Sequence, residues 1–153
     1  MNGDMQKRAK LRCMHLLEKR DYSEKELRRK LKNGKTSYTE EEIDGAIEYV
    51  RNFHYVDDGR YADRYIACMS SRKSRRQIEQ ELLMKGIDRK LVEQAFEEGE
   101  DIREDEQIAR WFRKKNFDPA EADQDAKRRM YAFLARKGFG QDAIRHAMKI
   151  EFE

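Results

Sequence analysis

The chain contains three copies of one short helical pattern, spaced about fifty residues apart. The segments 23–34, 74–86 and 126–138 align so that Leu27, Ile78 and Met130 coincide, at spacings of 51 and 52 residues. In each copy a leucine follows four positions later and the segment ends in glycine. A fixed period of this length is typical of repeat proteins, in which each unit buries its apolar face partly against its neighbours. The pattern therefore predicts a tandem array that presents an extended surface to a large partner.

The composition favours helix almost throughout. The 153 residues include one proline and are rich in strong helix formers. Apolar periodicity divides each copy into three short helices, giving repeats at residues 1–53, 54–101 and 102–153. We therefore predict an all-α fold, an elongated array of three tandem three-helix repeats forming one continuous molecule.

Local signals mark several helix ends. Ser23 and Thr39 each stand three residues before a glutamate, which predicts capping boxes. The Asp118-Pro119 pair predicts a helix start, because aspartate caps and proline suits the first turn. We expect Gly34 to end the preceding helix in the left-handed conformation that glycine adopts at little cost.

The two cysteines indicate a reducing compartment. Cys13 and Cys68 match no metal or redox spacing, and both fall on apolar faces of expected helices. We therefore expect reduced core thiols in a cytoplasmic protein. No apolar run approaches a membrane span, and the polar N-terminus lacks a signal-peptide core.

No pattern in the chain predicts an enzyme. His54 lies near Asp57 and Asp58, but helix capping explains these aspartates better than a metal site, because no further ligand stands at helix spacing. The chain has neither a phosphate-cradling glycine loop nor a nucleophile motif. We expect no catalytic activity, no cofactor and no bound metal.

Charge is segregated between helices although the net charge is only +3. The middle helix of each expected repeat is basic, whereas the third helices of the first two repeats are acidic. Preferences at helix ends explain part of this pattern, but not the acid-free stretch 127–137 or the basic cluster at 72–76. Stacked repeats would align the basic helices into a strip that attracts phosphates or an acidic protein surface. The candidate filament- or DNA-contact residues are Arg28, Arg29, Lys32, Arg72, Lys73, Arg75, Arg76, Lys85, Lys127, Arg128, Arg129, Arg136 and Lys137.

Aromatic side chains offer a second mode of nucleic-acid contact. Tyr55 and Trp111, among others, could stack on bases as in single-strand binders. Their helical spacing beside Ile and Ala favours a place in the core instead.

Three segments in register resemble the RecX family of bacterial regulatory proteins. They are residues 20–31 (RDYSEKELRRKL), residues 55–66 with YVDDGRYA, and residues 78–87 (IEQELLMKGI), followed by FLARKGF at 133–139. The resemblance implies three tandem three-helix repeats and a modulator, mostly an inhibitor, of the RecA recombinase. Family members are thought to lodge in the groove of the RecA–DNA filament and to inhibit its extension, ATP hydrolysis, strand exchange and coprotease activity in the SOS response. We accordingly expect the RecA filament as partner, weak non-specific DNA binding, no membrane contact and a monomer.

The turn before the second middle helix departs from the family pattern. Arg72 and Ser74 stand where the family has glycines, and Arg75 stands where it has proline. We therefore expect a tighter or more helical turn there.

The sequence is also compatible with two other functions. A direct DNA-binding module would need a recognition helix, and Arg75, Arg76 and Gln77 fit such a helix start in one repeat only. The other alternative is a scaffold that binds another protein. In that case the separation of basic and acidic helices would affect solubility alone.

Overall fold

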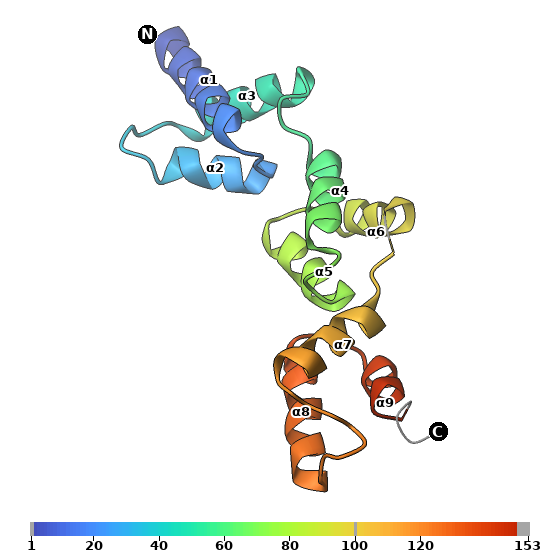
Figure 1. Ribbon diagram of the computed structural model, residues 1–153. Coiled ribbons are helices and arrows are strands. Elements are labelled where there is room, and N and C mark those ends of the chain that lie inside the picture. Colours follow the sequence, from blue (N-terminus) through green and yellow to red (C-terminus); the bar gives the residue numbers. More distant parts are fainter. Residues whose placement is uncertain (1, 100, 150–153) are drawn as a thin grey trace. The chain divides into compact units, whose positions relative to one another are not determined.

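The structure, a computed structural model, describes residues 2–99 and 101–149, which form nine α-helices and no strand (Figure 1). The all-α prediction is confirmed. The helices are α1 (Asn2–Lys19), α2 (Glu24–Lys32), α3 (Glu40–Asn52), α4 (Asp58–Met69), α5 (Arg75–Met84), α6 (Arg89–Glu98), α7 (Glu104–Lys114), α8 (Gln124–Arg136) and α9 (Gln141–Lys149).

The chain divides into two compact units. One consists of Met1–Arg64 and Leu82–Glu98, and the other of Tyr65–Glu81 and Gly99–Glu153. The division passes through α4 and α5, so the second group of three helices contributes to both units. The repeat limits at 53/54 and 101/102 remain predictions.

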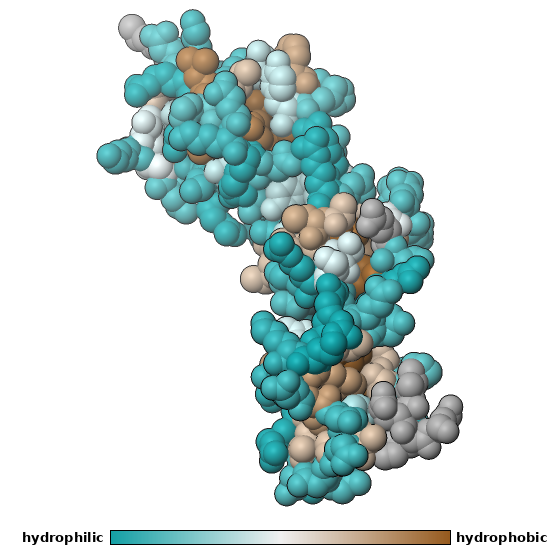
Figure 2. All heavy atoms as spheres, in the orientation of Figure 1, coloured by the Kyte–Doolittle hydropathy of each residue, from teal (hydrophilic) through white to brown (hydrophobic). Residues whose placement is uncertain are grey.

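The first unit has a core formed by one face each of α1, α2 and α3. Its buried residues come at helical spacing, as the apolar stripes predict. They are Ala9, Cys13 and Leu16 in α1, Leu27 and Leu31 in α2, and Ile43, Ala46, Ile47 and Val50 in α3, joined by Tyr22 and Val56. Figure 2 shows hydrophilic side chains over much of the visible face, with hydrophobic residues between them.

The second unit has a core between α7, α8 and α9. Its buried residues are Ile108, Met130, Leu134, Phe139 and Ile144, and partly buried aromatic residues, including Trp111 and Phe112, pack around them. The repeated Met130–Leu134 pair thus lies in the core, as the alignment of the three copies predicts.

Capping boxes form where the sequence predicts them. The Glu26 backbone N–H donates to Ser23 Oγ at 3.1 Å, and the Ser23 N–H donates to Glu26 Oε1 at 3.0 Å. Thr39 and Glu42 make the same reciprocal pair at the start of α3. Such a cap contributes about 1 kcal/mol to helix stability.

Within residues 2–99 and 101–149, four helices end in the same left-handed turn. Positive φ angles occur at His54 (60°), Gly86 (85°), Asn116 (52°) and Gly138 (94°). The next residue's N–H then donates to a carbonyl five positions back, the mark of a Schellman motif. These bonds are Tyr55 to Val50 (2.8 Å), Ile87 to Leu82 (3.2 Å), Phe117 to Phe112 (2.8 Å) and Phe139 to Leu134 (3.2 Å). The prediction for Gly34 is wrong, because its φ lies outside the left-handed region and α2 closes through Asn33 instead.

The serine that caps a middle helix also bonds the end of the next middle helix. Ser23 Oγ donates to the Lys85 carbonyl at 2.6 Å, and Ser74 Oγ donates to the Lys137 carbonyl at 3.0 Å. Both serines are fully buried. The positive N-terminus of α2 therefore meets the negative C-terminus of α5 in the first unit. In the second unit, the N-terminus of α5 meets the C-terminus of α8 in the same way. The sequence repeat thus corresponds to a repeated contact between helix ends.

Asp118-Pro119 does not start α8. Asp118 forms an isolated turn, in which its Oδ1 accepts from the Ala120 N–H at 3.0 Å. The helix begins at Gln124, and Asp123 caps it by accepting from the Ala126 N–H at 2.8 Å. The predicted start is wrong because Asp123, not Asp118, accepts the hydrogen bond from a free N–H group in the first turn of α8.

Two residues assigned to the core lie outside it. Cys13 is buried but Cys68 is exposed, because Cys68 is two residues, or about 200° of helix rotation, past buried Ile66. Tyr55 is 45 % exposed and stacks on Phe53, with ring centroids 6.0 Å apart.

Candidate functional site

Basic side chains surround a hollow between α1 and α2 in the first unit. Its volume is about 360 Å³. The lining residues are Arg12, Arg20, Arg29, Lys30, Glu26, Asn33 and Gly34. Four cations and one carboxylate give this hollow a positive potential suited to an anionic group.

A second basic hollow lies beside α7 in the second unit. Its volume is about 200 Å³. The lining residues are Ser71, Arg72, Gln107, Arg110, Trp111 and Lys114. We call this the Trp111 hollow.

Buried Gln107 fastens the turn 70–73 to α7. Its Nε2 donates to the carbonyls of Ser70 and Lys73, both at 2.9 Å, and the residue is 2 % exposed. The two acceptors fix the orientation of the amide. Oε1 is then left without a hydrogen-bond partner among the described residues, at a cost of about 1–3 kcal/mol. The side chain of Gln107 therefore fixes the position of the turn that carries Arg72.

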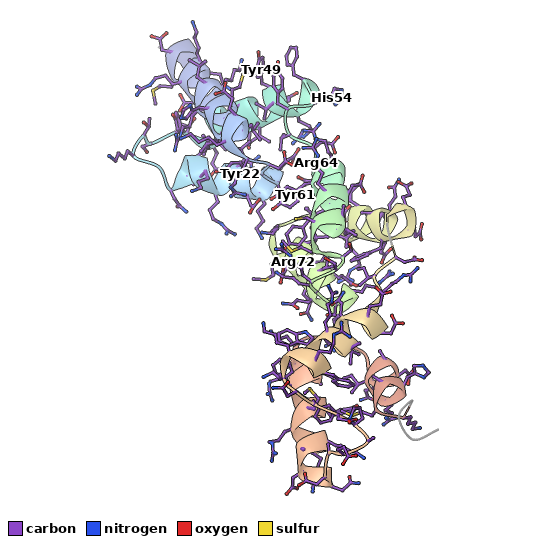
Figure 3. The ribbon with its side chains drawn as sticks, in the orientation of Figure 1. Tyr22, Tyr49, His54, Tyr61, Arg64 and Arg72 are labelled. Carbon is purple, nitrogen blue, oxygen red and sulfur yellow. The ribbon has the colours of Figure 1, made fainter. Side chains whose placement is uncertain are left out.

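The same turn, which lacks the glycines of the family pattern, has helical backbone hydrogen bonds. That it is tighter or more helical than the turn of the family stays a prediction. The N–H groups of Arg72 and Lys73 donate to the Met69 carbonyl at 2.9 and 3.0 Å, which prolongs the bonding of α4. Arg110 also donates to the Ser71 carbonyl. Figure 3 labels Arg72, which lies in this turn between α4 and α5.

A third basic hollow lies between α8 and α9. Its volume is about 300 Å³, and it is lined by Lys127, Arg128, Tyr131, Arg145, Met148 and Lys149. Four of these six residues are cations, and Tyr131 and Met148 add apolar surface.

Several of the candidate contact residues are paired with acids of their own chain. The ion pairs are Arg28–Asp44 (2.6 Å), Lys32–Glu40 (3.3 Å), Lys73–Glu81 (2.7 Å), Lys85–Glu26 (3.6 Å) and Arg128–Asp125 (2.7 Å). Part of the positive charge of α2 is therefore neutralised by the acidic residues of α3 rather than left for an external partner. Such partly exposed pairs contribute about 0–1 kcal/mol each.

The other candidates have varied surroundings. Arg29, Arg72, Lys127 and Arg128 line the three hollows. Lys137 lies over the rings of Trp111 and Phe133. Arg76, Arg129 and Arg136 are exposed and have no ion pair within the described part of the chain, and the Arg75 N–H donates to Glu104 Oε1 at 3.2 Å.

Lys73 and Glu81 form the most constrained of these pairs. Lys73 Nζ lies 2.7 and 3.0 Å from the two carboxylate oxygens, and Tyr65 donates its hydroxyl to the same carboxylate. Burial raises the pKa of Glu81, but the hydrogen bonds from Lys73 and Tyr65 and the Lys73 charge outweigh it. The net pKa of Glu81 is lowered. Lys73 thus has a structural partner, whereas neighbouring Arg72 faces the Trp111 hollow.

Sequence reasoning missed most cations that line the hollows. They are Arg12 and Arg20 in or just after α1, Lys30 in α2, Arg110 and Lys114 in α7, and Arg145 and Lys149 in α9. Arg110 and Lys114 stand four residues apart on either side of Trp111, and this i, i+4 spacing places them on one face of a helix. The sequence contains that signal, but the candidate residues come mainly from the middle helices, because these carry the densest positive charge.

The residues at 2–99 and 101–149 contain no group of three His, Cys, Asp or Glu side chains placed to hold a metal ion. Across the same ranges, no helix is both long and apolar enough to span a membrane.

Comparison with known proteins identifies the three groups of helices. Residues 9–49, 57–95 and 103–148 match the first, second and third three-helix domains of RecX, in that order. The chain belongs to the RecX family. The matches confirm that the fold consists of three tandem three-helix domains.

Individual RecX proteins are similar over nearly the whole chain. Regulatory protein RecX of Actinobacillus pleuropneumoniae serotype 5b (strain L20) is 37 % identical over 142 residues, which cover 91 % of this chain and 89 % of the relative. Regulatory protein RecX of Chromobacterium violaceum is 29 % identical, covering 93 % and 90 %. The crystal structure of RecX from Lactobacillus salivarius shares the fold, with a TM-score of 0.76 at 19 % identity over 97 % of each chain.

Proposed function

We propose that this chain regulates the RecA recombinase by binding the RecA–DNA filament. On this proposal it inhibits filament extension, ATP hydrolysis, strand exchange and coprotease activity, and it acts by binding rather than by catalysis. The observation that carries the proposal is the ordered match of all three RecX domains along one chain.

The charge distribution supports a partner rich in anionic groups. Three hollows are lined by three or four cations each, and together they include a single carboxylate, that of Glu26. A filament offers both DNA phosphates and acidic protein side chains to such surfaces. Their attraction is long-ranged and weakens with added salt.

Inhibition then requires differential binding. A ligand shifts an equilibrium only toward the state to which it binds more tightly. The protein must therefore bind more tightly to a filament that is inactive or unable to extend than to the active form.

Co-sedimentation tests the proposal directly. The protein is mixed with RecA filaments on single-stranded DNA, with the DNA alone and with RecA alone, and the fraction that sediments is measured. We expect much more protein to sediment with filaments than with either component. Equal binding to DNA alone would favour a direct DNA-binding module, and no binding to any of the three would favour a scaffold for another protein.

Charge reversal tests the named residues. Arg72→Glu and Arg76→Glu together should weaken filament binding, because both side chains are exposed and neither has an ion pair within the residues that the structure describes. Arg113→Glu is a control, since Arg113 is exposed on α7 and lines none of the three hollows. An unchanged affinity in the double variant would exclude these two residues from the interface.

A further inference from the structure

The Trp111 hollow combines an aromatic ring with three cationic side chains. Arg72, Arg110 and Lys114 line it beside Trp111, and no carboxylate does. Its volume of about 200 Å³ is below the roughly 300–1,000 Å³ of pockets that enclose a small molecule. A small basic hollow at the surface suits one residue of a polymer better than a free metabolite.

Arg72 is presented to this hollow by a fixed turn. The two hydrogen bonds from Gln107 Nε2, both 2.9 Å long, and the bond from Arg110 to the Ser71 carbonyl hold the turn against α7. Arg72 itself is exposed, and the described residues supply no ion pair for it. Its guanidinium is therefore available for an external anion, which it binds best when that anion is a phosphate or carboxylate.

The indole ring of Trp111 is positioned by aromatic packing. Phe133 contacts it edge-on, with centroids 5.0 Å apart and an interplanar angle of 77°. The ammonium groups of Lys114 and Lys137 lie 5.1 and 4.8 Å from the ring centroid. Both lysines have long flexible side chains, so their charges can move from the ring to a nearby phosphate when a flat group takes their place.

We propose that the Trp111 hollow binds one nucleotide of a single-stranded nucleic acid. The base stacks on Trp111, and the flanking phosphates lie among Arg72, Arg110 and Lys114. Stacking accepts any base, so binding has no sequence preference, and a duplex is disfavoured because its base faces are already stacked. This site needs no recombinase and goes beyond the function proposed above, so each can fail without the other.

The chain provides its own probe for this site, because Trp111 is its only tryptophan. The wild-type protein, without recombinase, is titrated with oligothymidine of about eight nucleotides, a length within the site sizes of single-strand binders. The comparison ligands are an abasic strand of equal length and inorganic phosphate. We expect oligothymidine to quench Trp111 fluorescence and the other two ligands to leave it nearly unchanged. No quenching by oligothymidine, or equal quenching by the abasic strand, would overturn the proposal.

Variants separate stacking from charge. With a labelled strand and anisotropy as readout, Trp111→Leu should weaken binding at least about fivefold, the loss expected for one stacked base. Arg72→Ala should reduce the slope of log affinity against log salt by about 0.7, which corresponds to one lost phosphate contact on a single strand. Arg113→Ala is the matched control on the same helix and should behave as wild type, with circular dichroism confirming that each variant is helical.

Two further comparisons use the same assay. Oligouridine and oligodeoxyuridine of equal length differ only in the 2′-hydroxyl, so their affinities show whether the site prefers RNA or DNA, and tighter binding of either strand supports the site. Wild-type affinity in Trp111→Leu, or tighter binding of a duplex of equal length, would contradict it.

Discussion

At the scale of single residues, both the backbone conformation and the packing at position 138 require glycine. Its φ of 94° is strained for any residue with a Cβ, and an added Cβ would lie 2.6 Å from Ser74 Oγ, which bonds the Lys137 carbonyl. We predict that Gly138→Ala lowers the free energy of unfolding by at least about 1–2 kcal/mol, measured by urea denaturation. Gly3→Ala is the control, because a Cβ at Gly3 in α1 meets nothing within 4 Å. Equal stability of Gly138→Ala and wild type would show that the contact between Ser74 and the end of α8 has room for a Cβ at Gly138.

Gln107 is the residue whose side chain matters most for the turn 70–73. Gln107→Leu removes both donors and leaves the Ser70 and Lys73 carbonyls unpaired, although it also removes the unpaired Oε1. We predict a net loss of about 1–3 kcal/mol in thermal or urea unfolding. Gln107→Glu should cost more at neutral pH, because an ionised carboxylate only accepts hydrogen bonds and would face two carbonyls. Unchanged stability in both variants would show that the hydrogen bonds from Gln107 to the turn 70–73 do not stabilise the fold.

Residue-scale details were the least predictable from the sequence. Gly34 and Gly138 end aligned segments, yet only Gly138 adopts the left-handed conformation. Cys68 looked like a core residue, but the face of α4 that is buried passes through Ile66 and leaves Cys68 exposed. Each outcome depends on how a helix is rotated against its neighbours, and periodicity fixes such a rotation only approximately.

At the scale of helices and turns, the Lys73–Glu81 pair couples the stability of α5 to pH. The folded-state pKa of Glu81 is lowered below its unfolded value, so the ionised carboxylate stabilises the fold. That contribution is complete above the ordinary glutamate pKa of about 4.3 and is lost as the pH falls through the lowered folded-state pKa. Glu81→Gln should therefore be less stable than wild type at pH 7, and the difference should shrink in acid. A difference independent of pH would show that the charge of Glu81 is not what stabilises α5.

Two helix ends use residues other than glycine in left-handed turns. His54 follows α3 with φ of 60° and Asn116 follows α7 with φ of 52°. Glycine adopts this conformation without the steric cost of a Cβ. We predict that His54→Gly and Asn116→Gly each raise the free energy of unfolding by about 0.5–1 kcal/mol, with the larger gain at His54 because asparagine tolerates the conformation better. A loss of stability in both would imply that their side chains make contacts that stabilise the turn.

Helices and their caps were predictable because the responsible interactions are local. Ser23 and Thr39 form their boxes with glutamates three residues away, and the apolar stripes of α1 and α3 are buried as expected. The bond from Ser23 Oγ to the Lys85 carbonyl spans 62 residues and has no local signal. The cations of α1 and α9 escaped prediction for a similar reason, since each of the hollows they line brings together residues from two helices. Arg110 and Lys114 of α7 did have a local signal in their spacing around Trp111, but the hollow they line also includes the distant residues Ser71 and Arg72.

At the scale of the whole molecule, the three RecX domains account for the repeat that the sequence displays. Each match falls on one group of three helices, and the chain and its curated relatives cover one another over about nine-tenths of their lengths. Cations lie around hollows in both compact units rather than at one point. A partner that is itself extended and anionic can bind several of these hollows at the same time. Once one weak contact has formed, the others form at a high effective concentration, so the overall affinity exceeds that of any single contact.

The measurement that tests regulation most directly is single-stranded-DNA-dependent ATP hydrolysis by a bacterial RecA, titrated with this protein well below one copy per recombinase. Action on the filament predicts inhibition at such ratios, because simple competition for DNA would need enough protein to cover it. The Arg72→Glu and Arg76→Glu double variant should inhibit less than Arg113→Glu at the same concentration. Undiminished hydrolysis, even with the wild-type protein in excess, would contradict the proposal that this chain is a regulator of RecA.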